Sequence, residues 1–342
     1  MRYFICRTCG VQHAAAASPP RRCRICEDER QYVGWQGQRW TTLDELRAEG
    51  LHSDVRRLEP DLLGIGVTPS LGIGQRGLLV RGERGNVLWD CAGYVDQEAI
   101  DQVRELGGLA AVSASHPHFY GCVVEWSQAF GGAPIYLPRA DGQWIMRPDP
   151  AVRLWEDRLE IDPGITLLRC GGHFEGSAVL HWAAGAEGRG ALLVGDTIQV
   201  VRDRRFVSFM RSYPNLIPLP ASAITRIAEI LEPLRFDRVY GGWWDLVVRS
   251  GAAEAVRASA ARYVAWVRGG AQAPPAGPRS GEGFALDSQF ICAALARYRG
   301  LAQYEGDALA VQVRVVGDDR ARADAQEVGD RLGELLEERR IR

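Results

Sequence analysis

Three apolar segments in the middle of the chain each end close to side chains that can ligate a metal. The segments are residues 109–112, 165–168 and 191–194. His116 and His118 follow the first segment, His173 follows the second and Asp196 follows the third. Short apolar runs of this kind are typical of buried strands, and neutral imidazole is a common ligand for catalytic transition metals. The sequence therefore predicts a metal centre where several strands end.

The motifs around these residues resemble those of the metallo-β-lactamase superfamily. The shared pattern is His-x-His after a strand, then Gly-His-x-x-Gly-Ser, then Gly-Asp-Thr, with an upstream hairpin that ends at Asp90. The resemblance covers roughly residues 61–270. It implies a mixed α/β (α+β) fold, the αββα sandwich, with the metal at one edge of its two sheets.

Two departures from the family pattern reduce the expected number of metal ions. Tyr120 and Gly121 stand where the first motif of the family has an Asp and its last His. The final His of the family usually follows a late strand, and Trp243 and Trp244 occupy the matching place, although indole offers only an N–H donor. The resemblance therefore implies one ion, zinc or iron, on the three histidines. Asp196 is expected either to ligate that ion or to hold its water.

Two Cys-x-x-Cys pairs near the N-terminus predict a second metal site. Each pair can direct two thiolates at one ion, so Cys6, Cys9, Cys23 and Cys26 would form a tetrahedral sulfur site. The spacing resembles that of a zinc ribbon or a short rubredoxin-like domain, and four thiolates suit zinc and iron alike. A domain of residues 1–40 has almost no core, so we expect the ion to hold it together. The alternative is four reduced cysteines without a ligand.

The remaining chain is predicted to form four further parts. These are a connecting helix segment (41–60), the metallo-β-lactamase-like domain (61–270), a linker rich in Gly, Ala and Pro (271–283) and a small α/β appendage (284–342). Within the main domain, helices are expected at 96–106, 123–130, 221–231 and 252–268. Residues 138–164 are expected to form a long connection beside the substrate cleft. The appendage is expected to contain a strand at 311–315 between two helices, near 287–299 and 319–339.

Composition excludes several classes of function. The 342 residues carry a formal net charge of −2, so the basic patch of a nucleic-acid-binding protein is not expected. No apolar run approaches the roughly 18–20 residues of a membrane span, and the N-terminus has no signal-peptide pattern. Eight scattered cysteines do not form a disulfide scaffold, which favours a reducing cytoplasm. The expected partner is a small-molecule substrate, and a homo-oligomer remains open.

Two other interpretations of the motifs are rejected, a dinucleotide-binding site and an amidohydrolase barrel. The Gly-x-Gly-x-x-Gly run at residues 72–77 lacks the preceding strand and following helix of a dinucleotide site. An amidohydrolase barrel also begins with His-x-His, but it would need eight βα units and several later ligands, whereas only His173 and His181 follow here. His181 alternates with apolar neighbours, so a structural role is expected for it.

Hydrolysis of an ester, thioester, lactone or amide is the leading reaction class. Three histidines leave a position on the ion for water, whose pKa the metal lowers to about 7. The family Asp missing at Tyr120 is a water-orienting group, and loss of a general base commonly costs about 10²–10⁴-fold in rate. Tyr120 could instead donate a hydrogen bond to an oxyanion, and Asp196 could orient the water.

Four residues are candidates for substrate contacts. Trp243 and Trp244 could form an aromatic wall for a planar or apolar substrate, or they could be core residues. Tyr213 and Asn215 follow the Asp196 strand, in a region that lies over the metal in the resembled family, or they form a turn braced by Pro214.

Two alternatives to hydrolysis remain from the sequence. His116, His173 and Asp196 form a set of two histidines and one carboxylate, which suits a mononuclear non-haem iron oxygenase or redox enzyme. An iron-bearing ribbon could then deliver electrons. The other alternative is a metal-binding protein without catalysis.

Overall fold

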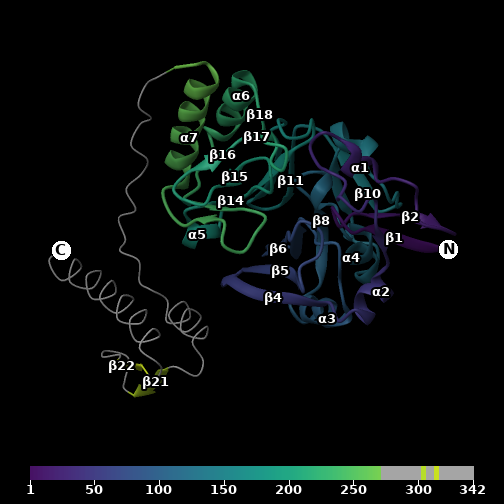
Figure 1. Ribbon diagram of the computed structural model, residues 1–342. Helices are drawn as coiled ribbons and strands as arrows, with labels where there is room; N and C mark the ends of the chain where they lie inside the picture. Colours follow the sequence, from purple (N-terminus) through teal and green to yellow (C-terminus); the bar gives the residue numbers. More distant parts are fainter. Residues whose placement is uncertain (271–301, 306–311, 316–342) are drawn as a thin grey trace. The chain divides into compact units, whose positions relative to one another are not determined.

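The computed structural model describes residues 1–270, 302–305 and 312–315 (Figure 1). Contacts divide the chain into two units, Met1–Ser280 and Gly281–Arg342. The described part of the second unit is an antiparallel pair, β21 (Ala302–Glu305) and β22 (Gln312–Val315). The predicted strand at 311–315 overlaps β22. The predicted linker and the two predicted helices of the appendage lie outside the described residues.

The first unit contains a seven-stranded sheet with the order β10-β9-β8-β7-β6-β5-β4. Its strands are β4 (His52–Glu59), β5 (Leu62–Thr68), β6 (Gly77–Arg81), β7 (Asn86–Trp89), β8 (Leu109–Ser113), β9 (Ile135–Pro138) and β10 (Val152–Trp155). Strands β4 to β7 pair antiparallel, and β7 to β10 pair parallel. Successive side chains point to opposite faces, so Leu78 and Val80 enter one core and Leu79 enters another.

A six-stranded sheet, of order β11-β12-β13-β14-β19-β20, faces the first. Its strands are β11 (Arg158–Asp162), β12 (Ile165–Arg169), β13 (Ala178–Trp182), β14 (Ala191–Leu193), β19 (Arg238–Tyr240) and β20 (Val247–Val248). Leu78 and Trp89 of the first sheet share one buried cluster with Leu167, Leu180 and Leu193 of the second. This cluster is therefore the core between the two sheets.

Helices cover the outer faces of both sheets. Helices α3 (Gln97–Glu105) and α4 (Val123–Ala129) bury residues in the cluster behind the first sheet, and α6 (Ala221–Leu231) and α7 (Ala252–Val267) do so behind the second. Asp96 caps α3 by accepting a hydrogen bond from the Ala99 N–H. The result is the predicted αββα sandwich. Among the described residues, no helix is both long and apolar enough to cross a membrane.

The N-terminal residues form a small three-stranded ribbon against the sandwich. Strands β1 (Arg2–Cys6), β2 (Gln12–Ala16) and β3 (Trp40–Thr41) have the order β2-β1-β3, and α1 (Arg24–Glu27) follows Cys23. In Figure 1 the purple β1 and β2 lie beside the sandwich near the N-terminus. Ile5 and Ile25 share a buried cluster with Val112, Ala114 and Phe174. The ribbon therefore has no separate core but extends that of the first sheet.

Two predicted segments differ from the structure. In residues 41–60 the helix is limited to α2 (Leu43–Ala48), with the Thr42–Glu45 capping box in place, and β4 then joins the large sheet. Residues 138–164, expected to form a long connection, contain the 3₁₀ turn η2 (Arg139–Trp144) and the edge strands β10 and β11. Polar and apolar residues alternate in β11 (Arg-Leu-Glu-Ile-Asp), which is the pattern of a half-buried strand and a signal that the prediction did not use.

Candidate metal centres

The three strand ends bring the predicted histidine ligands and Asp196 together. His116 and His118 lie in the loop after β8 that includes η1 (Pro117–Phe119), His173 follows β12 and Asp196 follows β14. One donor atom from each of the four residues lies within 4.8 Å of the others. His118 Nδ1 is 3.3 Å from His173 Nε2, and His116 Nε2 is 3.6 Å from Asp196 Oδ2. We call this cluster the histidine centre.

The burial of the histidine centre fits a metal ion. The four side chains are almost completely buried, and buried polar atoms are normally hydrogen-bonded. Yet His116 Nε2 and Asp196 Oδ1 have no hydrogen-bond partner within the described part of the chain. Three imidazoles and one carboxylate are a donor set suited to zinc or iron. The residues present therefore fit one ion.

Burial also sets the protonation of these groups. It lowers the pKa of His116 and of His118 well below the ordinary range, and lowers that of His173 to about 4. Burial raises the pKa of Asp196 to about 7. The low-dielectric surroundings penalise each charged form, so the histidines are neutral near pH 7. Neutral imidazole is the form that ligates metals.

Outer contacts fix the orientation of two of the rings. His116 Nδ1 is 2.9 Å from Ser115 Oγ, and the Ser115 N–H donates to Asp90 Oδ1 at 2.7 Å. His173 Nδ1 is 3.1 Å from the Met210 carbonyl oxygen. Such contacts leave the other ring nitrogen free for the metal. The sequence prediction missed Ser115, although a hydroxyl next to the first histidine of the motif was a usable signal.

Tyr120 occupies the core rather than the metal side of its loop. Its side chain is 3% exposed and lies in the cluster shared by the ribbon and the first sheet. It lines a small cavity with Val11, Val124 and Leu137. Its buried hydroxyl has no hydrogen-bond partner among the described residues, but the ring packs among core residues, and this position gives no support to the predicted role of Tyr120 as a donor to an oxyanion.

Crowding closes the position at which the resemblance expects the last histidine of the first motif. A Cβ atom at Gly121 would lie 2.3 Å from the Ala92 carbonyl oxygen, and the φ angle of Gly121 is +39°. Among the described residues, the groups that could hold a metal are the histidine centre and the four cysteines.

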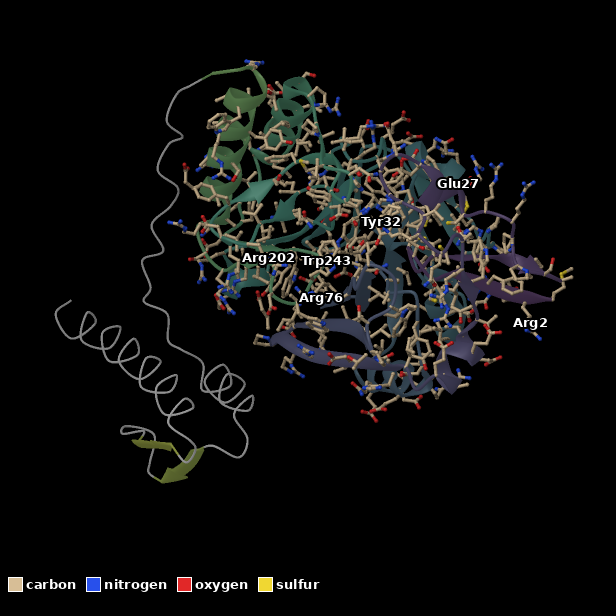
Figure 2. The ribbon with its side chains drawn as sticks, in the orientation of Figure 1. Arg2, Glu27, Tyr32, Arg76, Arg202 and Trp243 are labelled. Atoms are coloured by element: carbon tan, nitrogen blue, oxygen red, sulfur yellow. The ribbon has the colours of Figure 1, made fainter. Side chains whose placement is uncertain are left out.

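The two adjacent tryptophans have different surroundings. Trp243, half-buried, donates its indole N–H to the Ile73 carbonyl at 2.9 Å and meets Phe119 edge-on with 5.8 Å between ring centres. The ring of Phe119 lies 4.8 Å from that of His116. Trp243, which is labelled in Figure 2, is therefore separated from the histidine centre by one aromatic ring, that of Phe119.

Trp244 lies instead on the hairpin of β4 and β5. Its ring fills the space that a side chain at Gly64 or Gly66 would need. The guanidinium carbons of Arg56 and Arg76 lie 4.2 and 4.9 Å from its ring centre. These contacts indicate a packing role for Trp244 and give no support to the predicted substrate contact.

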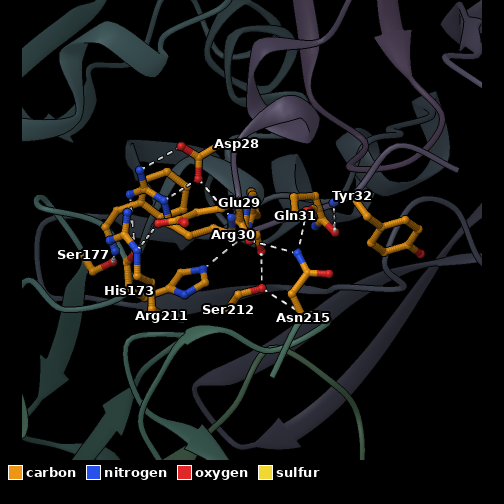
Figure 3. A network of polar contacts seen from close by, with 12 residues as sticks. Asp28, Glu29, Arg30, Gln31, Tyr32, His173, Ser177, Arg211, Ser212 and Asn215 are labelled. Atoms are coloured by element: carbon orange, nitrogen blue, oxygen red, sulfur yellow. Dashed lines mark hydrogen bonds and ion pairs between the residues drawn. The ribbon is translucent and has the colours of Figure 1, made fainter. Parts of the chain in front are cut away.

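Tyr213 and Asn215 also have different surroundings. The Tyr213 hydroxyl lies 3.0 Å from the Ser208 carbonyl oxygen and 3.4 Å from that of Asp196, and its ring centre is 5.8 Å from that of His173. The Asn215 amide donates to the carbonyls of Glu29 and Gln31, at 2.9 and 3.0 Å (Figure 3). Tyr213 therefore borders the histidine centre, whereas Asn215 attaches the ribbon.

The four cysteines form a second buried cluster. Cys6 Sγ is 3.5 Å from Cys26 Sγ, Cys9 Sγ is 3.8 Å from Cys23 Sγ, and all four sulfur atoms lie within 4.8 Å of one another. The Gln38 amide donates to Cys6 Sγ at 3.2 Å, and His13 Nε2 is 3.6 Å from Cys23 Sγ. Four converging thiols, one of which accepts a hydrogen bond from the Gln38 amide, fit one ion. No signal in the sequence marked Gln38 or His13.

The histidine centre at one edge of an αββα sandwich gives this chain the metallo-β-lactamase fold. Similar solved structures include VMB-1 (13% identity, 63% of this chain and 98% of that chain, TM-score 0.48) and a metallo-β-lactamase from Hirschia baltica (17%, 62% and 98%, 0.45). TTHA1623 in a di-iron-bound form is also similar (21%, 54% and 95%, 0.42). No family model matches the chain.

A curated relative gives the family. The chain is 50% identical over 266 residues to a protein of Bacillus subtilis (strain 168) described as "Uncharacterized protein YmaE". The match covers 77% of this chain and 96% of that protein. The chain belongs to the same family as YmaE.

Proposed function

We propose that this protein is a metal-dependent hydrolase that uses one ion to cleave an ester, thioester, lactone or amide. The observation that carries the proposal is the convergence of four buried donor atoms from His116, His118, His173 and Asp196. Three buried atoms of these side chains, His116 Nε2, His118 Nε2 and Asp196 Oδ1, have no hydrogen-bond partner among the described residues, and His116 Nε2 lies 3.6 Å from Asp196 Oδ2. A bound ion there would supply a Lewis acid for a substrate carbonyl and lower the pKa of water to about 7.

The residues of the chain would divide the work between holding the ion and moving a proton. The three histidines would hold the ion, with Ser115 and the Met210 carbonyl fixing two of the rings. Asp196 Oδ1 has no hydrogen-bond partner among the described residues. It is therefore the atom available to accept a proton from the attacking water, a task that the missing carboxylate at Tyr120 would otherwise perform.

The aromatic surroundings favour an apolar or aromatic substrate. Trp243 and Phe119 place two rings in succession beside His116. Aromatic rings offer large apolar contact area to planar or acyl groups. We therefore keep Trp243 as the proposed substrate contact and assign packing to Trp244.

The position of His118 favours hydrolysis over iron redox chemistry. A set of two histidines and one carboxylate would use His116, His173 and Asp196 and leave His118 outside. His118 Nδ1 nevertheless lies 3.3 Å from His173 Nε2, inside the cluster. A site with three histidines is typical of hydrolytic zinc centres, so the geometry supports a hydrolase better.

The test combines metal analysis with a substrate panel. Protein purified without added metal is analysed for ion type and count per chain, then assayed on aryl esters, thioesters, lactones and amides after loading with zinc or with ferrous iron. We expect hydrolysis that falls at least about 100-fold in His116→Ala, because a ligand of the ion is lost. The matched control is His52→Ala, which removes an exposed histidine.

Two results would contradict the hydrolase. One is the absence of hydrolysis of every substrate class in both metal-loaded forms. The other is oxygen consumption that requires ferrous iron and persists in His118→Ala, which would point to the redox alternative.

A further inference from the structure

The ribbon is linked to the backbone of two of the three histidines of the histidine centre. It reaches His173 directly through Arg30, and it reaches His118 through Gln75, which lies between β5 and β6 of the sandwich. We propose that the four-cysteine ribbon positions His118 and His173, so that a metal ion on the cysteines raises the metal affinity of the histidine centre. This inference rests on the metal centre of the proposed function but not on the reaction. Gln75 and Arg30 are the positioning residues that transmit the effect.

Gln75 joins the cysteine site to His118. Its amide nitrogen donates to the carbonyl oxygen of Cys9 at 3.0 Å and to that of His118 at 3.2 Å. The side chain is 3% exposed, and an amide group carries two N–H donors, one for each carbonyl. A single buried amide therefore connects a residue that holds one proposed ion to a residue that holds the other.

Arg30 joins the cysteine site to His173. It follows Cys26 by four residues, is 8% exposed, and directs Nη1 to the His173 carbonyl oxygen at 3.4 Å. Its guanidinium carbon lies 3.9 Å from the ring centre of Phe174, the next residue. Two hydrogen bonds to Asp28, at 2.6 and 3.0 Å, fix the plane of the guanidinium (Figure 3). These contacts set the position of the His173 backbone.

The same stretch of ribbon also acts on the His173 ring. Residues 28–31, here called the ribbon clasp, contact β17 (Met210–Ser212), whose Met210 carbonyl lies 3.1 Å from His173 Nδ1. The Ser212 hydroxyl donates to the Arg30 carbonyl at 3.2 Å. Figure 3 shows Arg30 of the clasp beside both His173 and Ser212. The clasp therefore holds both the backbone of His173 and the acceptor that orients its ring.

His116 is held differently. Its contacts through Ser115 lead to Asp90 at the end of β7, within the sandwich. The ribbon thus positions two of the three histidines, His118 and His173. A ribbon of this size depends on its ion for a fixed structure, so loss of that ion would release the clasp and the Cys9 carbonyl. Because coupling between sites is reciprocal, filling the histidine centre would tighten metal binding at the cysteines by the same factor.

Cobalt(II) titration of the full chain tests the proposal, because cobalt reports the two sites separately. Cobalt on four thiolates gives intense sulfur-to-metal charge-transfer bands, whereas cobalt on histidines and a carboxylate gives weak visible bands. Gln75→Leu and Arg30→Met keep all four cysteines. We expect the charge-transfer bands to titrate as in the wild type and the affinity of the histidine centre to fall about 10- to 100-fold, the range for outer contacts of metal ligands.

Matched controls separate positioning from general damage. Gln97→Leu and Arg22→Met make the same changes at exposed positions and should leave both affinities unchanged. Arg30→Lys keeps a donor for the His173 carbonyl, so its histidine centre should lose less cobalt affinity than that of Arg30→Met. Cys26→Ser should lose the charge-transfer bands and weaken the histidine centre. If the Cys26→Ser variant is unfolded, the test of the coupling depends on the Gln75 and Arg30 variants alone.

Three results have distinct meanings. Wild-type affinity of the histidine centre in both Gln75→Leu and Arg30→Met would overturn the coupling, as would equal losses in the exposed controls. Wild-type protein that shows no visible bands beyond those of the thiolate site would refute the histidine centre itself. Two filled, coupled sites without hydrolysis of any substrate would refute the proposed reaction and leave the coupling intact.

Discussion

The four-cysteine site and the histidine centre are built in opposite ways. The cysteines come from two short turns within residues 6–26, whereas the histidine centre collects residues 116–196 from strand ends in both sheets. The sandwich behind the histidine centre has an extensive core between and outside its sheets. The ribbon borrows its core from the first sheet. We therefore expect the four-cysteine site to need a metal ion for its structure, and the histidine centre to be formed before an ion binds.

The largest expected effect is a difference in hydrogen-exchange protection between variants that lack one ligand of the four-cysteine site and variants that lack one ligand of the histidine centre. In Cys9→Ser, hydrogen exchange should lose protection throughout residues 1–40, because structural zinc contributes on the order of 10–16 kcal/mol in finger peptides. In His116→Ala, the metal of the histidine centre should be lost while protection of the strands in both sheets is retained. Chelation of the wild type should resemble Cys9→Ser. Equal protection of the ribbon in the two variants would contradict this comparison.

Substitution of Gly121, which lies where the ribbon contacts the sandwich, should have an intermediate effect on the free energy of unfolding. The Gly121 carbonyl accepts a hydrogen bond from the Gln12 N–H of the ribbon at 3.2 Å, and the glycine has no room for a Cβ atom. Gly121→Ala should lower the free energy of unfolding by about 3 kcal/mol, from overpacking together with a positive φ.

Gly131→Ala is the matched control for Gly121→Ala. Gly131 has a φ of +71°, but a Cβ atom added there would have no neighbouring atom within 4 Å. The loss should therefore be limited to about 1–2 kcal/mol of backbone strain. Urea denaturation measures both free energies. Equal losses would show that crowding at Gly121 is relieved and that a side chain can be placed there.

The pH dependence of stability gives the smallest effect. Asp141 accepts a hydrogen bond from the Gly176 N–H, three residues after His173, and burial raises the pKa of Asp141 to about 7. The folded state therefore binds more protons than the unfolded state between about pH 4 and 7, so the contribution of Asp141 to stability falls as pH rises through that window. Asp141→Asn keeps an acceptor without the charge, so the free energy of unfolding should change less with pH in this window.

Asp101→Asn is the control for this measurement, because Asp101 is an exposed carboxylate on α3. Its stability should follow the wild-type slope between pH 4 and 7. The role given to Asp141 would be wrong if Asp141→Asn and Asp101→Asn showed the same slope.

Local patterns predicted much of this fold, and long-range packing decided the rest. Helix α6 has the predicted bounds because its apolar period is regular, and Asp96 and Thr42 cap helices as their positions indicate. The histidines and cysteines are recognisable because a few neighbouring residues carry each motif. Trp244 could not be assigned in this way, because its role depends on Gly64, about 180 residues earlier in the chain.

The contacts between ribbon and histidine centre are equally invisible in the sequence. Arg30 meets His173 from 143 positions away, and Gln75 meets Cys9 from 66 positions away. Arg30 stands in no recognisable motif, and the Gly-x-Gly-x-x-Gly run that contains Gln75 does not indicate this contact. The amide of Asn215 likewise donates to the ribbon carbonyls of Glu29 and Gln31, a contact that the residues around Asn215 do not indicate.

The position of the ribbon at the start of the chain has a consequence for the order of assembly during synthesis. All four cysteines precede Asp196 by at least 170 residues, which is roughly 10–30 s of translation at about 5–20 residues per second. A ribosome-bound chain can therefore acquire its thiolate ion well before the last strand end of the histidine centre is made. The ribbon clasp would then be in place when β17 emerges, and metal availability early in translation would decide how much of the protein is later able to load its second site.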